Sequence, residues 1–313
     1  MIDKPLERSV LPHTKLPARF WRKLGERLIV SVLFLAGLSS VATMAAIVLL
    51  LLWESLEFFR VVSFWEFITS TEWTPILSRD NPQYGILPLL SGTLVSAGVA
   101  LLVSIPIGTV AAMYLSEFAL PRVRDFIKPI LEILAGVPTV VYGYFALLVV
   151  TPALQTILPD LGTFNLLSAG MVMGVMIVPF VSSISEDAMQ AVPSNLREAA
   201  HASGSTRFQV AWRVVYPAAI SGISSAYILA ASRAVGETMI VSIAAGGLPQ
   251  MVWNPMEQGA TITAFIVQVA KGDLPRGTLE YQTIFAAGLT LIVITLALNI
   301  IGHFLAKRYR EIY

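Results

Sequence analysis

The chain has 313 residues, of which 56% are hydrophobic and only 13% are charged, and its mean hydropathy is +0.73. Soluble domains carry about 25% charged residues, so this composition excludes an ordinary soluble protein and indicates an integral membrane protein. The formal net charge of +1 gives no sign of a nucleic-acid partner, and the absence of cysteine together with three widely spaced histidines indicates neither a metal site nor a cofactor.

The first 27 residues form a basic arm ahead of a long apolar run. We expect residues 1–27 to lie in the cytoplasm, where Lys and Arg fix the topology and contact anionic membrane lipid. Residues 28–53 carry no charged side chain and exceed the roughly 20 apolar residues that a crossing helix needs. Because no small-residue cleavage site closes this run, we predict a retained first transmembrane helix and not a signal peptide.

Residues 54–83 follow as an expected periplasmic loop that is rich in Phe and Trp. The aromatic residues predict a helix lying at the outer membrane interface. An aromatic belt without a docking role is an equally good interpretation.

Five further regions predict five more membrane-spanning helices. They are nearly free of Asp, Glu, Lys and Arg and comprise residues 81–116, 133–159, 161–185, 214–256 and 281–306. The region 214–256 is too long for one crossing, at about 65 Å as a helix rising 1.5 Å per residue, so we predict a break at 246–249, where Gly and Pro cluster. Proline inside the spans is expected to kink them at Pro106, Pro138 and Pro179. The fold class is therefore an all-α membrane protein with six transmembrane helices.

The distribution of Lys and Arg predicts that both termini are cytoplasmic. Sixteen of the 21 basic residues fall in the arm, in the loops 117–132 and 186–213, and in the tail 307–313, whereas only four fall in the outer loops. Basic residues accumulate on the cytoplasmic side of a membrane. The chain is thus expected to be a multi-pass protein of the inner (plasma) membrane with a cytoplasmic tail.

The cytoplasmic loop between the fourth and fifth spans carries the signals of a helical hairpin. Asn195 with Glu198, and Thr206 with Gln209, have the spacing of a capping box. Gly204 lies where a helix C-cap or sharp turn is expected. We predict a short helix, a glycine turn and a second short helix, which together form a rigid handle for a partner. The alternative is a solvated surface loop with ordinary caps.

Arg233 and Glu237 are the two charges inside the fifth region. A charge in mid-span costs roughly 2.5–3.5 kcal/mol on insertion scales. We therefore expect both residues to have a structural or functional role that offsets this cost. Their i, i+4 spacing predicts an ion pair on one helix face. The planar guanidinium is suited to bind a tetrahedral oxyanion, and Glu237 is expected to hold Arg233 in the empty site or to accept a bond from a protonated anion oxygen. The alternative is a charge pair that fixes packing against a sister subunit.

The hairpin sequence resembles the EAA loop of ABC importer permeases. That family's pattern is Glu-Ala-Ala, three residues, Gly, nine residues and Ile-x-Leu-Pro, and Glu198, Ala199 and Gly204 match it here. Tyr216 stands where the family has Leu, which puts one packing position in doubt. The resemblance implies that this loop docks into a groove on a separate ATPase subunit and carries its motion to the membrane.

Other segments resemble the PstC-type permease subunits of phosphate importers. They are residues 84–93, 114–118, 134–138 with 141–143, 183–188 and 233–239. The resemblance implies a type I ABC importer permease fold, with a five-span core at 84–306 and a coupling loop at 186–216. It also implies that Arg233 and Glu237 lie on or beside the phosphate pathway.

The implied function is a transmembrane permease subunit of an ATP-driven inorganic phosphate importer in a bacterial inner membrane, forming half of the translocation pathway. The chain lacks the Gly-xxxx-Gly-Lys-Ser/Thr loop that cradles ATP phosphates, so no enzyme activity is expected and ATP hydrolysis is assigned to another chain. The implied partners are an A-type permease subunit in a heterodimer, an ATPase subunit dimer, a periplasmic phosphate-binding protein and membrane lipid.

Three other functions remain open at the level of sequence. The first is an ABC permease for another oxyanion, such as sulfate or molybdate, which competition for uptake would separate from phosphate. The second is an ion-coupled secondary transporter, which would work without an ATPase and often contains an inverted repeat. The third is a scaffold that senses phosphate through its partners without transporting it.

Overall fold

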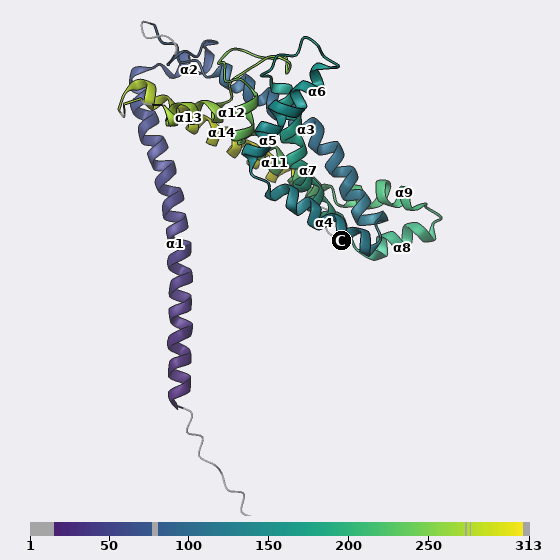
Figure 1. Cartoon of the computed structure of the whole chain (residues 1–313). Helices are drawn as coiled ribbons and strands as arrows, with labels where there is room; N and C mark the ends of the chain where they lie inside the picture. The colour runs from purple at the N-terminus through teal and green to yellow at the C-terminus, as the bar shows by residue number, and fades with distance from the viewer. Residues whose placement is uncertain (1–15, 77–80, 273, 276, 309–313) are drawn as a thin grey trace, which may run out of the picture. The chain divides into compact units, whose positions relative to one another are not determined.

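The computed structural model of the protein describes residues 16–76, 81–272, 274–275 and 277–308 (Figure 1). Within these ranges the chain is mostly helical and contains no β-strand, only isolated bridges between Trp73 and Tyr84 and between Gly246 and Gly259. The predicted all-α fold is confirmed. The chain divides into two compact units, Met1–Leu50 and Leu51–Tyr313.

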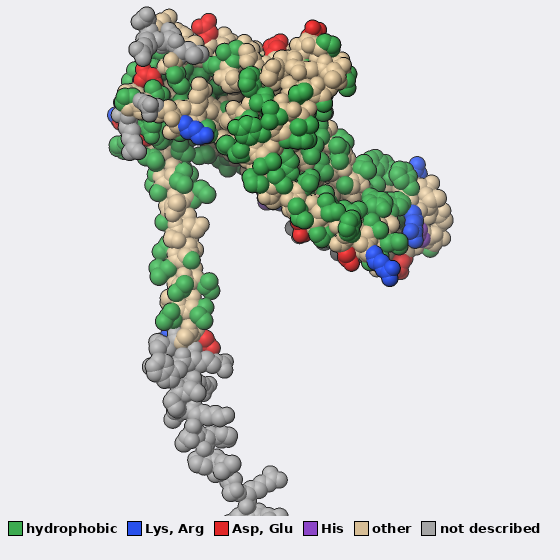
Figure 2. Space-filling view, viewed as in Figure 1, with side chains coloured by type: hydrophobic (Ala, Val, Ile, Leu, Met, Phe, Trp, Pro, Cys, Tyr) green, Lys and Arg blue, Asp and Glu red, His purple; other side chains and the backbone are tan. Residues whose placement is uncertain are grey.

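Helix α1 (Leu16–Val61) begins in the first unit and ends in the second. From Leu28 to the end of the first unit its apolar side chains are exposed, except for the half-buried Val48, and Figure 2 shows them in green. This helix is longer at both ends than the run 28–53, because no proline follows Pro17 to interrupt it. A helix with apolar side chains on every side is typical of a membrane span.

The second unit contains the remaining helices. They are α2 (Phe64–Thr69), α3 (Leu87–Met113), α4 (Pro121–Gly136), α5 (Thr139–Phe145), α6 (Thr151–Gln155), α7 (Leu166–Gln190), α8 (Ser194–Ala202), α9 (Arg207–Val210), α10 (Tyr216–Ala218), α11 (Ile220–Val235), α12 (Met239–Ala244), α13 (Ile262–Lys271) and α14 (Leu279–Arg308). Three π-helical segments continue α3, α5 and α9, namely η1 (Tyr114–Phe118), η2 (Ala146–Val150) and η3 (Ala211–Val215).

Four stretches of the described chain are long and apolar enough to cross a membrane, Gly25–Val61, Leu87–Phe118, Leu166–Gln190 and Leu279–Phe304. Two bent pairs bring the number to six when each pair is counted as one span. The six predicted spans are confirmed in that sense, but the third and fifth are not straight helices.

The third span is bent by 87° between Pro121–Gly136 and Thr139–Gln155. Its first arm, α4, occupies most of the region that we expected to be the loop 117–132. The bend lies at Val137 and Pro138, because proline lacks an N–H and disfavours helical geometry in the residue before it. The kink expected at Pro138 is confirmed, whereas Pro106 and Pro179 lie inside uninterrupted helices.

The fifth span differs more from its prediction. Its first part is bent by 73° between Arg207–Ala218 and Ile220–Val235. The helix then stops at Gly236 and resumes as the short α12, which ends at Ala244. A break near 246–249 is therefore present, but a second one interrupts the helix between Arg233 and Glu237.

The core of the second unit is the close pairing of α3 and α7. A Cβ on Gly170 would come within 2.7 Å of Val99 Cβ, and one on Gly174 within 2.8 Å of the Ala100 carbonyl oxygen. The Gly-xxx-Gly spacing on α7 thus lets the two backbones approach closely. The consequence is that α3 and α7 pack as one body.

The hairpin of α8 and α9 lies at one end of this helix pair, and α6, α12 and α13 lie toward the other end (Figure 1). At the end away from the hairpin, Phe58, Phe67 and Trp73 form a buried aromatic cluster. Charged side chains gather around the hairpin, whereas the surface over the middle of the unit is mostly hydrophobic (Figure 2). This distribution is the one expected of a membrane protein with a polar extension on one side.

Candidate functional site

Arg233 lies in the last turn of α11, and its guanidinium carbon is 4.6 Å from the centre of the Phe180 ring on α7. A cation over an aromatic face is attracted by the ring quadrupole, by about 0.5–2 kcal/mol depending on desolvation. The C-terminal end of a helix also favours a cation, because its carbonyl dipoles sum to a partial negative charge. These two effects stabilise the charge of Arg233.

Glu237 caps the start of the next helix, α12, and does not pair with Arg233. Its Oε1 accepts hydrogen bonds from the backbone N–H groups of Met239 at 3.0 Å and of Ile240 at 3.4 Å, in the first turn of α12. Its backbone carbonyl accepts a hydrogen bond of 2.5 Å from the Thr263 hydroxyl on α13. A carboxylate that caps free N–H groups at a helix start is stabilised by them.

The predicted i, i+4 ion pair between Arg233 and Glu237 is therefore wrong. The pairing requires a continuous helix, and α11 ends at Val235 with Gly236 as its cap, so that no ion pair joins the two described side chains. The two charges instead flank a helix break, each at the helix end that favours its sign. Among the residues that the structure describes, no carboxylate pairs with Arg233, so its N–H donors are available to an anion.

A cavity of about 240 Å³ lies between α4 and α7 and shares the Phe180 ring with Arg233. Its lining also includes Lys128, Glu132, Ser183 and the fully buried Glu186. Both signs of charge are present, so the cavity is not by itself an anion site. Its position places α4 beside the part of α7 that contacts Arg233.

Glu186 holds α4 against α7 through two ion pairs. Its side chain is 0% exposed, with Oε1 2.8 Å from Arg124 Nε and Oε2 3.3 Å from Lys128 Nζ. Gln190 also donates a hydrogen bond of 2.7 Å to Oε1. A buried carboxylate is tolerated only when it is paired and hydrogen-bonded. We did not predict this cluster, because the cations precede Glu186 by about sixty residues and nothing local links them.

The hairpin has the predicted helix–turn–helix form. Gly204 has a φ of +83°, a conformation that favours glycine, between α8 and α9. The capping box of Thr206 and Gln209 is confirmed, with reciprocal bonds of 3.3 and 2.9 Å. The expected cap at Asn195 is wrong, because Pro193 precedes the first helical residue and Asn195 lies inside α8.

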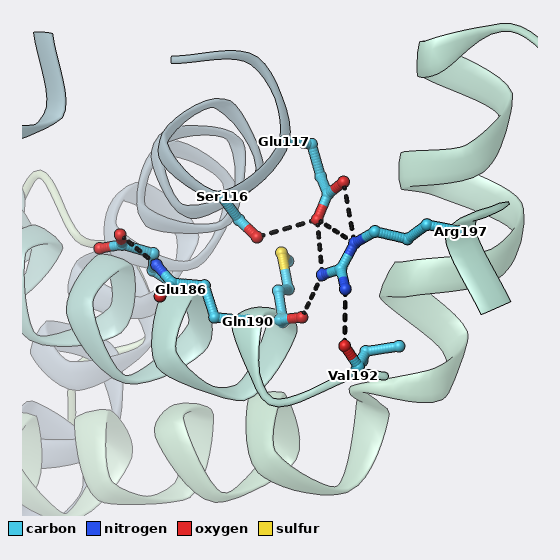
Figure 3. A network of polar contacts seen from close by, with 7 residues as sticks. Ser116, Glu117, Glu186, Gln190, Val192 and Arg197 are labelled. Carbon is cyan, nitrogen blue, oxygen red and sulfur yellow. Dashed lines mark hydrogen bonds and ion pairs between the residues drawn. The ribbon is translucent and has the colours of Figure 1, made fainter. Parts of the chain in front are cut away.

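The two faces of α8 have different environments. Glu198 and Ala199 are exposed, as is Gly204 at the turn. Arg197 turns the other way and forms an ion pair of 3.0 Å with Glu117 in η1 (Figure 3). Sequence reasoning missed this pair, since 80 residues separate its members. The only sequence sign was that both residues lie in segments that resemble known permeases.

The structure keeps the two predicted sets of site residues apart. Glu198, Ala199 and Gly204 belong to the hairpin, and Arg233 and Glu237 belong to the junction of α11 and α12 (Figure 1). Across the described ranges, no group of three or more His, Asp and Glu side chains is arranged to hold a metal ion.

Comparison with known proteins supplies the context for these sites. The sequence matches the family described as "Binding-protein-dependent transport system inner membrane component" over residues 104–311. It is 32% identical over 274 residues to the probable ABC transporter permease protein YqgH of Bacillus subtilis, covering 87% of this chain and 88% of that protein.

Several relatives have phosphate transport in their names. The phosphate transport system permease protein PstC of Xylella fastidiosa is 32% identical over 262 residues, which cover 77% of this chain and 78% of that protein. The probable phosphate transport system permease protein PstC of Methanocaldococcus jannaschii is 32% identical over 267 residues, which cover 78% of this chain and 82% of that protein.

Solved structures with a similar fold are membrane components of ABC transporters. A bacterial alginate ABC transporter in complex with an alginate-bound periplasmic protein has a TM-score of 0.61 at 17% identity, covering 94% of this chain and 99% of that one. The MetNI methionine ABC transporter in an inward-facing conformation has a TM-score of 0.54 at 18% identity, and the match covers 72% of this chain and 95% of that one.

Proposed function

The chain belongs to the family of binding-protein-dependent transport system inner membrane components, and on that basis we propose that it is a permease subunit of an ATP-driven inorganic phosphate importer, forming half of the translocation pathway. Its fold is that of an ABC importer permease. It is a multi-pass inner-membrane subunit, and ATP hydrolysis belongs to a separate chain.

The observation that carries the proposal is the state of Arg233. Its guanidinium lies against Phe180, half-buried in an apolar region, and no carboxylate in the described part of the chain forms an ion pair with it. Such a group presents a fork of N–H donors that matches two oxygens of a tetrahedral oxyanion. The names of the relatives from a bacterium and an archaeon support phosphate as that anion.

Glu237 has a second role in this proposal. Both of its backbone hydrogen bonds use Oε1, which leaves Oε2 for a protonated oxygen of phosphate. Sulfate carries no such proton at neutral pH, so this acceptor favours phosphate over sulfate. The same carboxylate stabilises the start of α12 and therefore fixes the geometry of the helix break beside Arg233.

The hairpin is proposed as the docking element for the ATPase. Support comes from its exposed Glu198 and Ala199, from the tight turn at Gly204 and from the capped start of α9, which make it rigid. The complete assembly would contain an A-type permease subunit, two ATPase subunits and a periplasmic phosphate-binding protein. Closure of the ATPase would displace the hairpin and switch the pathway from outward to inward exposure.

Uptake of radiolabelled phosphate by cells or reconstituted vesicles tests the role of Arg233. Arg233→Gln is expected to lower uptake by about tenfold or more, because a hydrogen bond to a charged group contributes about 1.5–3 kcal/mol. Arg233→Lys keeps the charge but loses the planar fork of donors, so we expect its phosphate uptake to lie between that of wild type and that of Arg233→Gln. Arg122→Gln, which changes an exposed arginine at the start of α4, is the control.

Three outcomes would contradict the proposal. Wild-type uptake by Arg233→Gln would remove this residue from the pathway. Equal competition by sulfate or molybdate would indicate a different oxyanion, and uptake by this subunit in the absence of the ATPase would indicate an ion-coupled transporter.

A further inference from the structure

The side chain of Arg197 connects three separate elements of the protein (Figure 3). From α8, its Nε lies 3.2 and 3.3 Å from the two carboxylate oxygens of Glu117, and its Nη2 donates to Oε1 at 3.0 Å. Its Nη1 donates to the carbonyl oxygen of Val192 at 2.6 Å, and Nη2 also donates to that of Met189 at 2.8 Å. All three nitrogens of the guanidinium are thus used.

The partners of Arg197 belong to the two helices that form the centre of the fold. Glu117 lies in η1, the continuation of α3, and Met189 lies in the last turn of α7. The side chains of Arg197 and Glu117 are 22% and 11% exposed, and Ser116 donates a further bond of 3.0 Å to Glu117. At this burial a bidentate ion pair is stronger and more directional than one on an open surface.

The connection continues toward the candidate transport site. Close approach at Gly170 and Gly174 makes α3 and α7 pack as one body. Helix α7 also carries Phe180, whose ring lies against the guanidinium of Arg233. A displacement of α8 that is transmitted to these two helices therefore reaches the contact between Phe180 and Arg233.

We propose that Arg197 is a positioning residue that couples the hairpin to the transmembrane helices, through its ion pair with Glu117 and its bonds to the end of α7. The inference rests on the proposed function, since it assigns the route by which the ATPase moves the pathway. Glu198, the next residue, is exposed and would be accessible to the ATPase, whereas the Arg197 side chain is turned toward Glu117 and the end of α7. In this proposal Glu198 contacts the ATPase, and the neighbouring Arg197 transmits the displacement of α8 to α3 and α7.

The test uses the complete transporter, with its ATPase and binding protein, reconstituted in vesicles. In Arg197→Gln we expect the ATPase to remain bound and basal ATP hydrolysis to stay within about twofold of wild type, because the Arg197 side chain faces η1 and α7 and not the exposed side of α8 that carries Glu198. We expect two quantities to fall by about tenfold each, which is within the usual range of coupling between two sites. They are the stimulation of ATP hydrolysis by the phosphate-loaded binding protein and the amount of phosphate imported per ATP. Glu117→Gln should give the same pattern, and Arg122→Gln should behave as wild type.

A cross-link provides the second arm, because the chain has no cysteine of its own. In the double variant Glu117→Cys with Arg197→Cys, we expect the uncoupled behaviour of Arg197→Gln. Joining the two thiols with a short bifunctional thiol reagent should restore stimulation by about fivefold or more, because the link replaces the lost connection. Each single-cysteine variant treated with the same reagent controls for reaction elsewhere.

Two results would overturn the inference. One is stimulated hydrolysis in Arg197→Gln equal to that of wild type. The other is a cross-linked double variant whose hydrolysis is stimulated no more than that of the double variant without the link. If Arg197→Gln fails to assemble, the cross-linking experiment decides between the outcomes. Failure of the proposed function is recognised separately, since the wild-type complex itself would then import no phosphate.

Discussion

At the scale of single residues, Arg233 and Glu186 are held in contrasting ways. Arg233 is held by an aromatic ring and a helix end, and no carboxylate of the described residues pairs with its donors. Glu186, by contrast, is fully buried, with its Oε1 bound by Arg124 and Gln190 and its Oε2 in an ion pair with Lys128. The first arrangement fits a transient ligand, and the second fits a permanent structural contact.

The Glu186 cluster predicts a large loss of stability when the carboxylate is removed. Glu186→Gln removes the counter-charge of Arg124 and Lys128, whose side chains are each 31% exposed, and we expect the loss of these charge-assisted contacts to cost about 1.5–3 kcal/mol. We expect a clearly lower Tm for the purified protein in detergent. Asp187→Asn is the matched control, because Asp187 contacts the same lysine at 3.5 Å from a side chain that is 66% exposed, where an ion pair contributes at most about 1 kcal/mol. Equal Tm values for the two variants would contradict this assignment.

At the scale of the elements, the decisive contact is that of α3 with α7. The glycines of α7 are not interchangeable with other small residues, because a Cβ on Gly174 would lie 2.7 Å from Val103 Cβ. Gly98 of α3 has the opposite environment, because a Cβ added there would meet no atom within 4 Å. The packing of the helix pair therefore depends on which face of each helix carries the glycine.

These two glycines make a matched pair of variants. Gly174→Ala is expected to force the helices apart and to destabilise the protein by about 1–3 kcal/mol, the usual cost of overpacking. Gly98→Ala is expected to be neutral or to stabilise the helix by up to about 1 kcal/mol, since alanine is the better helix former. Thermal unfolding of both variants is the measurement, and a Gly174→Ala protein as stable as Gly98→Ala would show that the contact is looser than described.

At the scale of the whole molecule, function depends on which side of the membrane each end of the second unit faces. By the positive-inside rule, the abundance of basic residues near α4 and the hairpin predicts that this end is cytoplasmic. The loop between α12 and α13, which contains Trp253, would then face the outside. An ATPase can use the hairpin only in this orientation.

Single cysteines introduced into the cysteine-free chain test the orientation. Trp253→Cys replaces a side chain that is 73% exposed, and we expect it to react with a membrane-impermeant thiol reagent in intact cells. Arg122→Cys, at the exposed start of α4, is expected to react only in inverted vesicles. The reverse pattern would invert the topology and remove the hairpin from reach of the ATPase.

The sequence by itself determined the all-α membrane fold, the approximate positions of six spans and the hairpin with its turn at Gly204. These features are local, because lipid demands a long charge-free helix and a left-handed turn demands glycine. The sequence also identified Arg233 and Glu237, since a charge within an apolar run is visible without any structure.

Only the tertiary structure decided what these charges contact. The helix break at Gly236 separated Arg233 from Glu237 although their spacing predicted a pair, and packing brought Phe180 to Arg233 instead. In the same way, Arg197 meets Glu117 only after α3, α7 and α8 have assembled. The physical reason is that a side chain's partner is chosen by which helices pack together, and distant residues of one chain leave no periodic pattern that records that choice.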